Sequence, residues 1–447
     1  MTVYYVVNEG LVSDNLLSGL FMWISFLYAW QFLEFFIVFK DHFFSKPTSG
    51  YEQTANMDCP PATAVIVAYL PNEADIIMET LAHFRAIEYD NELQVILAYN
   101  SPKILPVEQD IAKLQKAWPQ FSAVKVAGST SKCDNVNEVL KNIKGVFVGI
   151  FDADHLPLPN SFQLAWGDLS RGADVVQGRT KINARYVDSA LSHIIAAEFE
   201  VRHGLEHHTR KSVYGYAVFG GSNGFWRTDA LQAMGMDPAM LTEDIDSSVR
   251  AMSYGYKITY NHHLISLEQP PPSLHALVKQ RLRWSQGWYQ VSWRSWFSIF
   301  SCEYLSLRQK IGMHWMLKML LPLQVLVSAG QSFTLVTLSS QLGFAIVFMM
   351  TSVWCIPQLL FLFKFAEVPS FSTKLLYALN VLPLLMFFMV IDMIAQVRLM
   401  IGYSTWHITS RKKVEEDRPP LSPSTFRYSP SSVHLSSEVV ERGPNHL

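Results

Sequence analysis

The pattern of apolar and polar positions changes character twice along the chain. Residues 16–39 form one nearly continuous apolar stretch, residues 59–288 alternate short apolar runs with amphipathic segments, and long apolar stretches return from residue 315. Stretches of about 20 apolar residues are long enough to cross a bilayer, whereas short β-rich runs are typical of buried strands. The pattern therefore predicts membrane segments on both sides of one sizeable soluble domain.

The central region alternates strand-like and helix-like segments. The strand-like runs occupy residues 62–70, 93–100, 122–128 and 146–151, and the amphipathic segments occupy residues 75–87 and 108–118. This order predicts an α/β domain with a mostly parallel central sheet covered by helices. In such sheets, ligands bind at the carboxyl ends of the strands.

The first apolar stretch, Leu16–Phe39, is predicted to span the membrane, with a buried core helix as the alternative. Only uncharged or acidic residues precede it, and Lys40, His42 and Lys46 follow it. The positive-inside rule then places the N-terminus outside and the next domain in the cytosol. Glu34 is costly inside a span and is expected to face protein or the interface.

Three further apolar segments are Trp315–Ser339, Phe344–Phe365 and Leu375–Val397. The stretch from Trp288 to Trp315 is rich in Trp, Phe, Arg and Lys, which favours a helix lying in the membrane interface. Three spans would leave the basic run at residues 411–413 outside, although its charge favours the inside. One segment is therefore expected to lie in the interface or to re-enter, with a further, unrecognised span as the alternative. Leu375–Val397 is the candidate because Pro383 is expected to break it and because it contains Asp392.

The composition fits a membrane protein with a soluble domain. Hydrophobic residues make up 49% of the chain and charged residues 17%, and the formal net charge is -2. That charge, without a basic stripe interleaved with aromatics, gives no support for nucleic-acid binding. The four cysteines are scattered, with neither metal-ligand spacing nor a disulfide framework: Cys59, Cys133, Cys302 and Cys355.

Two carboxylates end the fourth strand-like run, in the segment GIFDADHLPLP. Asp152 and Asp154 repel each other in a cleft unless a cation bridges them. A few hard oxygen ligands suit Mg²⁺ or Mn²⁺, which also binds phosphate. Asp-x-Asp is short, however, and a solvated turn is the alternative for the motif taken alone.

Two downstream segments strengthen the case for a phosphate-handling site. Thr242-Glu243-Asp244 opens a helix-like stretch, and the segment QRLRW occupies residues 280–284. An arginine pair beside a tryptophan can hold a diphosphate while the ring stacks on a sugar. The alternative for the second segment is a basic interfacial helix.

Taken in order, these motifs resemble those of family-2 glycosyltransferases, especially the membrane-embedded cellulose, chitin and hyaluronan synthases. The matching motifs, between residues 64 and 288, are VIVAYLPNE, SKCDNVNEVL, DAD, VVQGR, FGGSNGFWR, TED and QRLRW. The resemblance implies a GT-A-type nucleotide-sugar-binding domain. Four parts then follow: a membrane anchor at 1–45, the cytosolic transferase domain at 58–290, interfacial and transmembrane helices at 291–411, and a Pro/Ser-rich disordered tail at 412–447.

The resemblance also implies residue roles. Asp244 would be the general base of an inverting direct displacement, and Asp154 would bind the metal, Mg²⁺ or Mn²⁺. The nucleotide-sugar donor would contact Tyr69, Glu73, Asn100, Lys132, Asp152, Asp154, Gln280, Arg281, Arg283, Thr409 and Arg411. The acceptor would contact Gly221, Ser222, Asn223, Glu243 and Trp284.

The sequence departs from the family pattern after the second strand-like run. Tyr99 and Asn100 stand where the family carries an acidic pair that contacts the base. Asn100 can still hydrogen-bond uracil, so UDP stays the favoured nucleotide. The segment WHITSRKK, residues 406–413, resembles the short gating segment of these synthases, with a basic membrane-flanking tail as the alternative.

The leading hypothesis is a multi-pass membrane enzyme of the plasma membrane or Golgi that extends a β-linked polysaccharide. The second hypothesis keeps the chemistry but transfers a single sugar to a lipid, as in the ceramide glucosyltransferases that the chain resembles in size and in its single N-terminal span. The third is a transporter or scaffold that inherited the fold without the chemistry. Nucleotide sugar, glycan or lipid acceptor, and membrane lipid are the expected partners.

Overall fold

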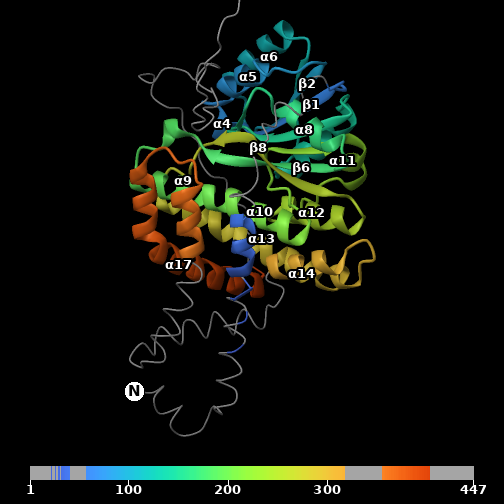
Figure 1. Cartoon of the computed structure of the whole chain (residues 1–447). Coiled ribbons are helices and arrows are strands. Elements are labelled where there is room, and N and C mark those ends of the chain that lie inside the picture. The colour runs from blue at the N-terminus through green and yellow to red at the C-terminus, as the bar shows by residue number, and fades with distance from the viewer. Residues whose placement is uncertain are drawn as a thin grey trace, which may run out of the picture. The chain divides into compact units, whose positions relative to one another are not determined.

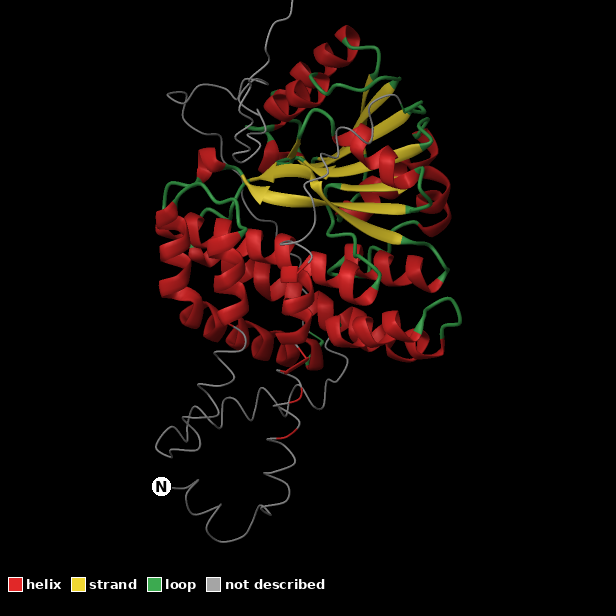
Figure 2. Ribbon diagram, viewed as in Figure 1, coloured by secondary structure: helices red, strands yellow, loops and turns green. Residues whose placement is uncertain are grey.

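The computed structural model describes residues 57–317 and 355–402, together with Met22, Phe26 and residues 29–30 and 32–40. Thr409, Arg411 and the 406–413 segment lie outside the described residues, as does most of the predicted Trp315–Ser339 span. Within the described part, an eight-stranded sheet has the order β3-β2-β1-β4-β7-β6-β8-β5. Figure 2 shows this sheet with helices on both sides.

The strands are β1 Ala62–Tyr69, β2 Leu93–Asn100, β3 Phe121–Lys125, β4 Phe147–Asp152, β5 Leu156–Pro157, β6 Val175–Ile182, β7 Gly224–Arg227 and β8 Ile258–Glu268. The helices are α4 Leu70–Glu73, α5 Ile77–Arg85, α6 Val107–Ala117, α7 Lys132–Val139, α8 Ser161–Leu169, α9 Ala190–Val201, α10 His207–Thr209, α11 Thr228–Met234, α12 Glu243–Ser253, α13 Leu274–Ser301, α14 Leu307–Met316 and α17 Phe371–Met400. Two π-helical turns, η3 Arg202–Glu206 and η4 Arg210–Tyr214, flank α10.

The predicted parallel sheet is confirmed for β1 to β4 and corrected beyond them. β3, β2, β1 and β4 pair in parallel, in the order that alternating strands and helices produce. β7 then pairs antiparallel with both β4 and β6, β6 pairs in parallel with β8, and β5 closes the edge antiparallel to β8. The sheet is therefore mixed, and β7 and the short β5 run opposite to the other strands.

β1, β2 and β4 are largely apolar because both of their faces are buried. In β1, Val65 and Val67 belong to one core cluster, while Ala64 and Ile66 belong to the cluster on the opposite face. Side chains alternate between the two faces of a strand, so a strand with helices on both sides needs apolar residues at every position. This explains why β1, β2 and β4 were recognisable as uninterrupted apolar runs.

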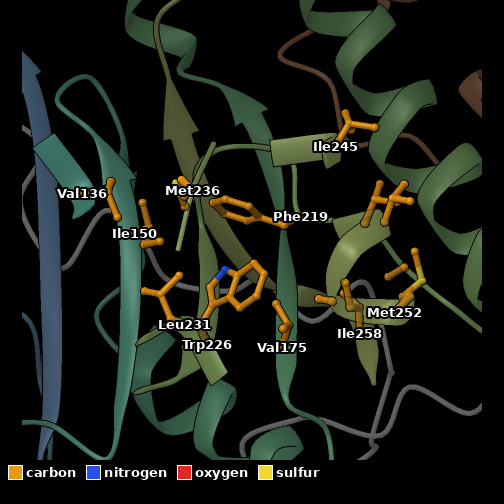
Figure 3. Close-up of a cluster of buried hydrophobic side chains, with 14 of the residues drawn as sticks. Val136, Ile150, Val175, Phe219, Trp226, Leu231, Met236, Ile245, Met252 and Ile258 are labelled. Atoms are coloured by element: carbon orange, nitrogen blue, oxygen red, sulfur yellow. The ribbon is translucent and has the colours of Figure 1, made fainter. Parts of the chain in front are cut away.

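One of the two clusters packs around the turn that precedes β7. Phe219 lies before that turn and Trp226 lies after it, with their rings edge to face and their centroids 5.6 Å apart. Figure 3 shows both rings among aliphatic side chains that include Ile150 and Leu231. Both aromatic side chains are fully buried. The turn between them is therefore fixed at both ends by the core.

A helical layer next to β6 and β8 joins the sheet to α17. α9 packs against β6, and α17 packs against both α9 and α13 (Figure 1). Ser285 Oγ on α13 donates to Asp392 Oδ1 on α17 at 2.5 Å. Asp392 therefore faces another helix, which agrees with the high cost of a carboxylate exposed to lipid.

The expected break at Pro383 is wrong, because α17 is one continuous helix from Phe371 to Met400 with Pro383 inside it. A proline removes a single i→i−4 hydrogen bond, and neighbouring helices compensate for such losses in membrane segments. Within the described residues, α17 is the one helix long and apolar enough to cross a membrane, and Cys355–Lys364 is a shorter apolar helix. The other predicted spans stay predictions.

Glu34, in the described part of the first predicted span, faces other protein residues. Glu34 is buried and accepts a hydrogen bond from the Tyr214 hydroxyl, which also accepts from Trp30 Nε1 at 2.8 Å. Tyr214 ends η4, so the helix at residues 32–40 contacts the segment that follows α9. Glu34 faces protein, as expected.

Candidate active site

The carboxyl ends of three parallel strands meet at one edge of the sheet. Tyr69 at the end of β1 lies opposite Asn100 at the end of β2, and Val67 lies opposite Asp152 at the end of β4. Pairing in register brings these strand ends to one line, because parallel strands run the same way. Asp152 and Asn100 thus belong to the edge where ligands bind in α/β folds.

Lys132 links this edge to the turn at residues 220–224. It is the first residue of α7, whose N-terminus is closed by a capping box between Ser131 and Asp134. Its ammonium forms an ion pair with Asp152 and donates to the Gly221 carbonyl at 2.5 Å. Burial alone would lower the pKa of Lys132, but the charges of Asp152 and of the two acids at 243 and 244 raise it. Lys132 is therefore a fixed cation at the centre of the site.

The turn at residues 220–224 comes close to Asp244 because of its backbone geometry. Gly221 has φ +87, and a Cβ added there would lie 3.2 Å from Asp244 Oδ2. Asn223 has φ +53 and is the single non-glycine residue with positive φ in the described part of the chain. Ser222 Oγ accepts from the Asp152 backbone N–H at 3.1 Å. The turn therefore contacts β4 on one side and α12 on the other.

Gln177 holds this turn from β6, and sequence reasoning assigned it no role. Its side chain is fully buried. Oε1 accepts from Gly220 N at 2.8 Å, and Nε2 donates to the carbonyls of Ser222 and Asn223 at 3.0 and 3.3 Å. The amide of Gln177 thus satisfies backbone groups that the irregular turn cannot pair internally. A sequence signal for Gln177 existed, because this residue lies inside the VVQGR motif.

Asp244 combines burial with a neighbouring acid. Glu243 and Asp244 are the first two residues of α12, and Asp244 Oδ1 accepts from Ile245 N at 2.9 Å. Burial and the charge of Glu243 raise the pKa of Asp244 to about 7, against the opposing influence of the Ile245 N–H, Lys132 and Arg283. A carboxyl group that titrates near neutral pH suits a general base.

The residues around Asp154 fit a divalent metal. Asp154 is buried, and its Oδ2 accepts from Gln269 N at 3.3 Å. Among the described residues, no three His, Cys, Asp or Glu side chains converge on a metal position. A hard cation here would thus take further ligands from substrate phosphate and water, which is how Mg²⁺ is often held. The carboxylate of Asp154 is a hard oxygen donor, which agrees with that chemistry.

The residue after Asp154 also enters an ion pair. His155 Nε2 lies 2.9 Å from Glu268 Oε2, and His155 Nδ1 lies 3.2 Å from Ser266 Oγ. Burial opposes the charged imidazole, but the hydrogen bond and charge of Glu268 raise the pKa of His155. This contact joins the segment after β4 to the end of β8.

The QRLRW segment lies on α13, and its members make different contacts. Arg283 Nη1 donates to the Leu241 carbonyl at 3.0 Å, just before α12, and its charge acts on Asp244. Arg281 is buried in an ion pair with Glu198 of α9 at 2.8 Å. Gln280 is buried as well, and Trp284 is partly buried. The structure therefore brings Arg283 to Asp244 and joins Arg281 to α9.

A close approach of two helices explains how Arg283 reaches α12. A Cβ added at Gly287 would lie 2.5 Å from Thr242 Cγ2 and 2.8 Å from Thr242 N. Only glycine fits such a contact without a backbone shift. Gln290 Oε1 adds a hydrogen bond from Leu241 N at 3.0 Å. α13 thereby fixes the start of α12, which carries Asp244.

The predicted base-side residues lie together at the ends of β1 and β2. Asn100 donates to the Ser129 carbonyl at 3.1 Å and accepts from Asn135 Nδ2 at 3.1 Å. These two partners fix the orientation of the Asn100 amide. Glu73 lies in α4, directly after β1, and accepts from Asn72 at 2.7 Å. Asn135 was missed as a supporting residue, although it lies in the SKCDNVNEVL motif.

Comparison with known proteins identifies the family. The sequence profile described as "Glycosyltransferase like family 2" matches residues 60–287, just over half of the 447 residues. The chain belongs to this family. The matched range contains every predicted site residue that the structure describes.

Relatives in this family resemble part of the chain. The poly-beta-1,6-N-acetyl-D-glucosamine synthase of Staphylococcus epidermidis is 25% identical over 240 residues, which cover 53% of this chain and 57% of that protein. The probable glucomannan 4-beta-mannosyltransferase 7 of Oryza sativa subsp. japonica is 23% identical over 304 residues, covering 65% of this chain and 50% of that protein. The chain thus spans about half the length of these curated relatives.

A solved structure supports the fold. The mannosyltransferase PcManGT from Pyrobaculum calidifontis, in complex with GDP-Man and Mn²⁺, superimposes with a TM-score of 0.57 at 15% identity and covers 87% of this chain and 100% of that chain. At this identity the likeness shows the fold alone. The chain has a GT-A-like α/β fold, and its strand pairing shows that the sheet is mixed.

Proposed function

We propose that the protein is a membrane-integral, inverting glycosyltransferase that moves a sugar from a UDP-sugar to the end of a growing β-linked polysaccharide. One observation carries the proposal: Asp244, with a pKa of about 7, lies beside a glycine turn whose carbonyl is held by the Lys132–Asp152 ion pair. A carboxyl group with this pKa beside a fixed cation supports the role of Asp244 as a general base.

Asp244 would remove the proton from the acceptor hydroxyl. The hydroxyl oxygen then forms a bond to the anomeric carbon, the bond from that carbon to the β-phosphate oxygen breaks, and its electron pair leaves with the diphosphate. One displacement inverts the anomeric configuration, so an α-linked donor gives a β-linked product. Positioned proton transfer of this kind contributes roughly 10²–10⁴-fold to the rate.

The cationic side chains would stabilise the leaving diphosphate. Lys132 and Arg283 both act electrostatically on Asp244, which supports this role for both. Fixed donors aimed at developing charge act strongly where water is excluded. A divalent metal held by Asp154 would neutralise further negative charge on the diphosphate when bound.

The relatives favour a polymer over a lipid acceptor. The names of the two curated relatives describe synthesis of poly-beta-1,6-N-acetyl-D-glucosamine and of glucomannan. The helix α17, which is long and apolar enough to cross a membrane, supports membrane integration. The choice of UDP rests on Asn100, whose fixed amide at the end of β2 can hydrogen-bond uracil.

The test is transfer by membranes containing the full chain. Labelled UDP-glucose, UDP-N-acetylglucosamine and GDP-mannose are supplied with Mg²⁺ or Mn²⁺, and the products are partitioned by solvent. We expect label from a UDP-sugar in water-soluble or insoluble polymer. Label in the organic phase would instead establish a lipid acceptor, and no transfer from any donor would refute the proposal.

Asp244→Asn tests the base, with Asp229→Asn as the matched control. Asp229 also lies in the first turn of its helix and accepts from the next backbone N–H, from Ala230 at 2.8 Å, but it is exposed and away from the site. Asp244→Asn is expected to lower transfer at least about 10²-fold while UDP still binds. Asp229→Asn is expected to keep full activity. Full activity of Asp244→Asn would overturn the assignment.

A further inference from the structure

Glu198 is a buried carboxylate in the middle of the largely apolar α9. It is 5% exposed, and both of its oxygens are engaged. Oε1 accepts from Arg202 at 2.7 Å, and Oε2 accepts from Arg281 at 2.8 Å. A buried carboxylate is costly unless it is paired and hydrogen-bonded, so this residue type needs a reason at this position.

The two arginines bound to Glu198 also contact one indole ring. The guanidinium carbon of Arg281 lies 4.3 Å from the Trp284 ring centroid, and that of Arg202 lies 5.5 Å from the same centroid. Both distances are within the range of cation–π attraction. A single carboxylate thus fixes two cations, and the two cations contact the ring predicted to stack on the acceptor.

The cluster keeps unsatisfied hydrogen-bond donors. Arg281 is 3% exposed, yet its Nε and Nη1 have no hydrogen-bond partner among the described residues. Glu198 pairs with both guanidinium groups, and the charge of Glu206 also acts on Arg202. Glu268 is the other acid whose charge acts on Arg281, and it is paired with His155 beside Asp154. The two N–H groups of Arg281 that lack a partner in the described part of the chain are suited to binding an anion.

We propose that Glu198 is a positioning residue, which orients Arg281 toward the donor diphosphate and, through Arg281 and Arg202, fixes Trp284. The inference rests on the proposed function, because it needs a diphosphate-bearing donor. It assigns a role to a residue outside every motif singled out in the sequence. Glu198 touches neither substrate directly and acts through the arginine that does.

The test compares Glu198→Gln with Glu200→Gln in the full-length protein. Glu200 lies on the same helix and is equally buried, but it pairs with Arg179 of β6 and with the Glu367 backbone N–H. Glu198→Gln is expected to weaken UDP binding in the presence of Mn²⁺ by about 10-fold or more, as for loss of a charged hydrogen-bond partner. Glu200→Gln is expected to lower thermal stability and leave UDP affinity within about 2-fold.

A double-mutant cycle shows whether the effect passes through Arg281. On an Arg281→Ala background, Glu198→Gln should weaken UDP binding by no more than about 2-fold. Glu198→Asp, which keeps the charge, should restore part of the affinity lost in Glu198→Gln. The inference would be overturned if the loss of UDP affinity in Glu198→Gln added fully to the loss in Arg281→Ala. It would also be overturned if Glu200→Gln lost as much UDP affinity as Glu198→Gln.

The two proposals fail in different ways. If the wild-type protein binds no UDP and transfers no sugar, the proposed function is wrong. If the wild type binds and transfers while Glu198→Gln behaves as the wild type, only the positioning role of Glu198 is wrong.

Discussion

At the scale of single residues, the proposed role of Asp244 as the general base predicts a pH dependence of transfer. Burial and Glu243 raise the pKa of Asp244 to about 7, and a general base works only in its ionised form. Below that pH the proton is already bound, so kcat/KM should fall about 10-fold per pH unit as the pH decreases below 7. A profile from pH 5 to 9 should rise to a plateau near pH 8. A rate independent of pH between 5 and 7 would contradict this role.

A second residue-scale prediction concerns Gly221. Gly221→Ala should lower both stability and transfer, because φ +87 disfavours a side chain and the new Cβ would lie 3.2 Å from Asp244 Oδ2. Gly172→Ala is the control, since Gly172 has φ +96 with nothing within 4 Å. Both variants should lose about 1–2 kcal/mol of unfolding free energy. Only Gly221→Ala should lower kcat, and an equal fall in Gly172→Ala would sink the prediction.

The charged residues in short motifs could be predicted as site residues from the sequence. The residues that hold them in position could not. Asp152, Asp154 and Asp244 occur in ordered motifs, so their types and spacing suggested a shared site. Glu198 contacts Arg281 across 83 positions in the chain, a pairing that no local pattern encodes. Gln177 lies in a quoted motif, but its hydrogen bonds to the turn depend on the pairing of β6 beside β7.

At the scale of elements, β6 shapes the turn through Gln177. Gln177→Leu should destabilise the protein, because it leaves the Gly220 N–H and the Ser222 carbonyl without their partner, at about 1–3 kcal/mol for an orphaned group. It should also lower transfer, since Gly221 lies between these two residues. Val176→Ala is the control, because Val176 belongs to the core cluster on the other face of β6. It should lower the melting temperature but preserve kcat in the folded fraction.

The elements themselves differ in how much the sequence predicted. β1, β2 and β4 are buried on both faces, so their apolar runs reveal them directly. β7 has four residues and β8 contains Asn261, His262 and His263, so neither forms a clear apolar run. β7 pairs antiparallel with β4 and β6, and β8 pairs in parallel with β6, all of them distant in sequence. The periodicity of apolar residues therefore predicted β1, β2 and β4 but did not reveal β7 and β8.

At the scale of the whole molecule, α17 connects the transferase domain with the expected membrane. Leu379 on α17 is 69% exposed and Tyr254, after α12, is 68% exposed. In intact membranes carrying Cys302→Ser, Leu379→Cys should resist a water-soluble maleimide because lipid covers it, whereas Tyr254→Cys should react. Equal reactivity of the two cysteines, in vesicles with the transferase domain facing outward, would argue against a membrane location for α17.

The central claim is that one base at Asp244 drives a single displacement at a donor held along the β4 edge. The most direct measurement is the anomeric configuration of the product, determined by NMR from an α-linked UDP-sugar with known stereochemistry. We expect a β-linked product. An α-linked product would require a second displacement or a different geometry, and it would contradict the account.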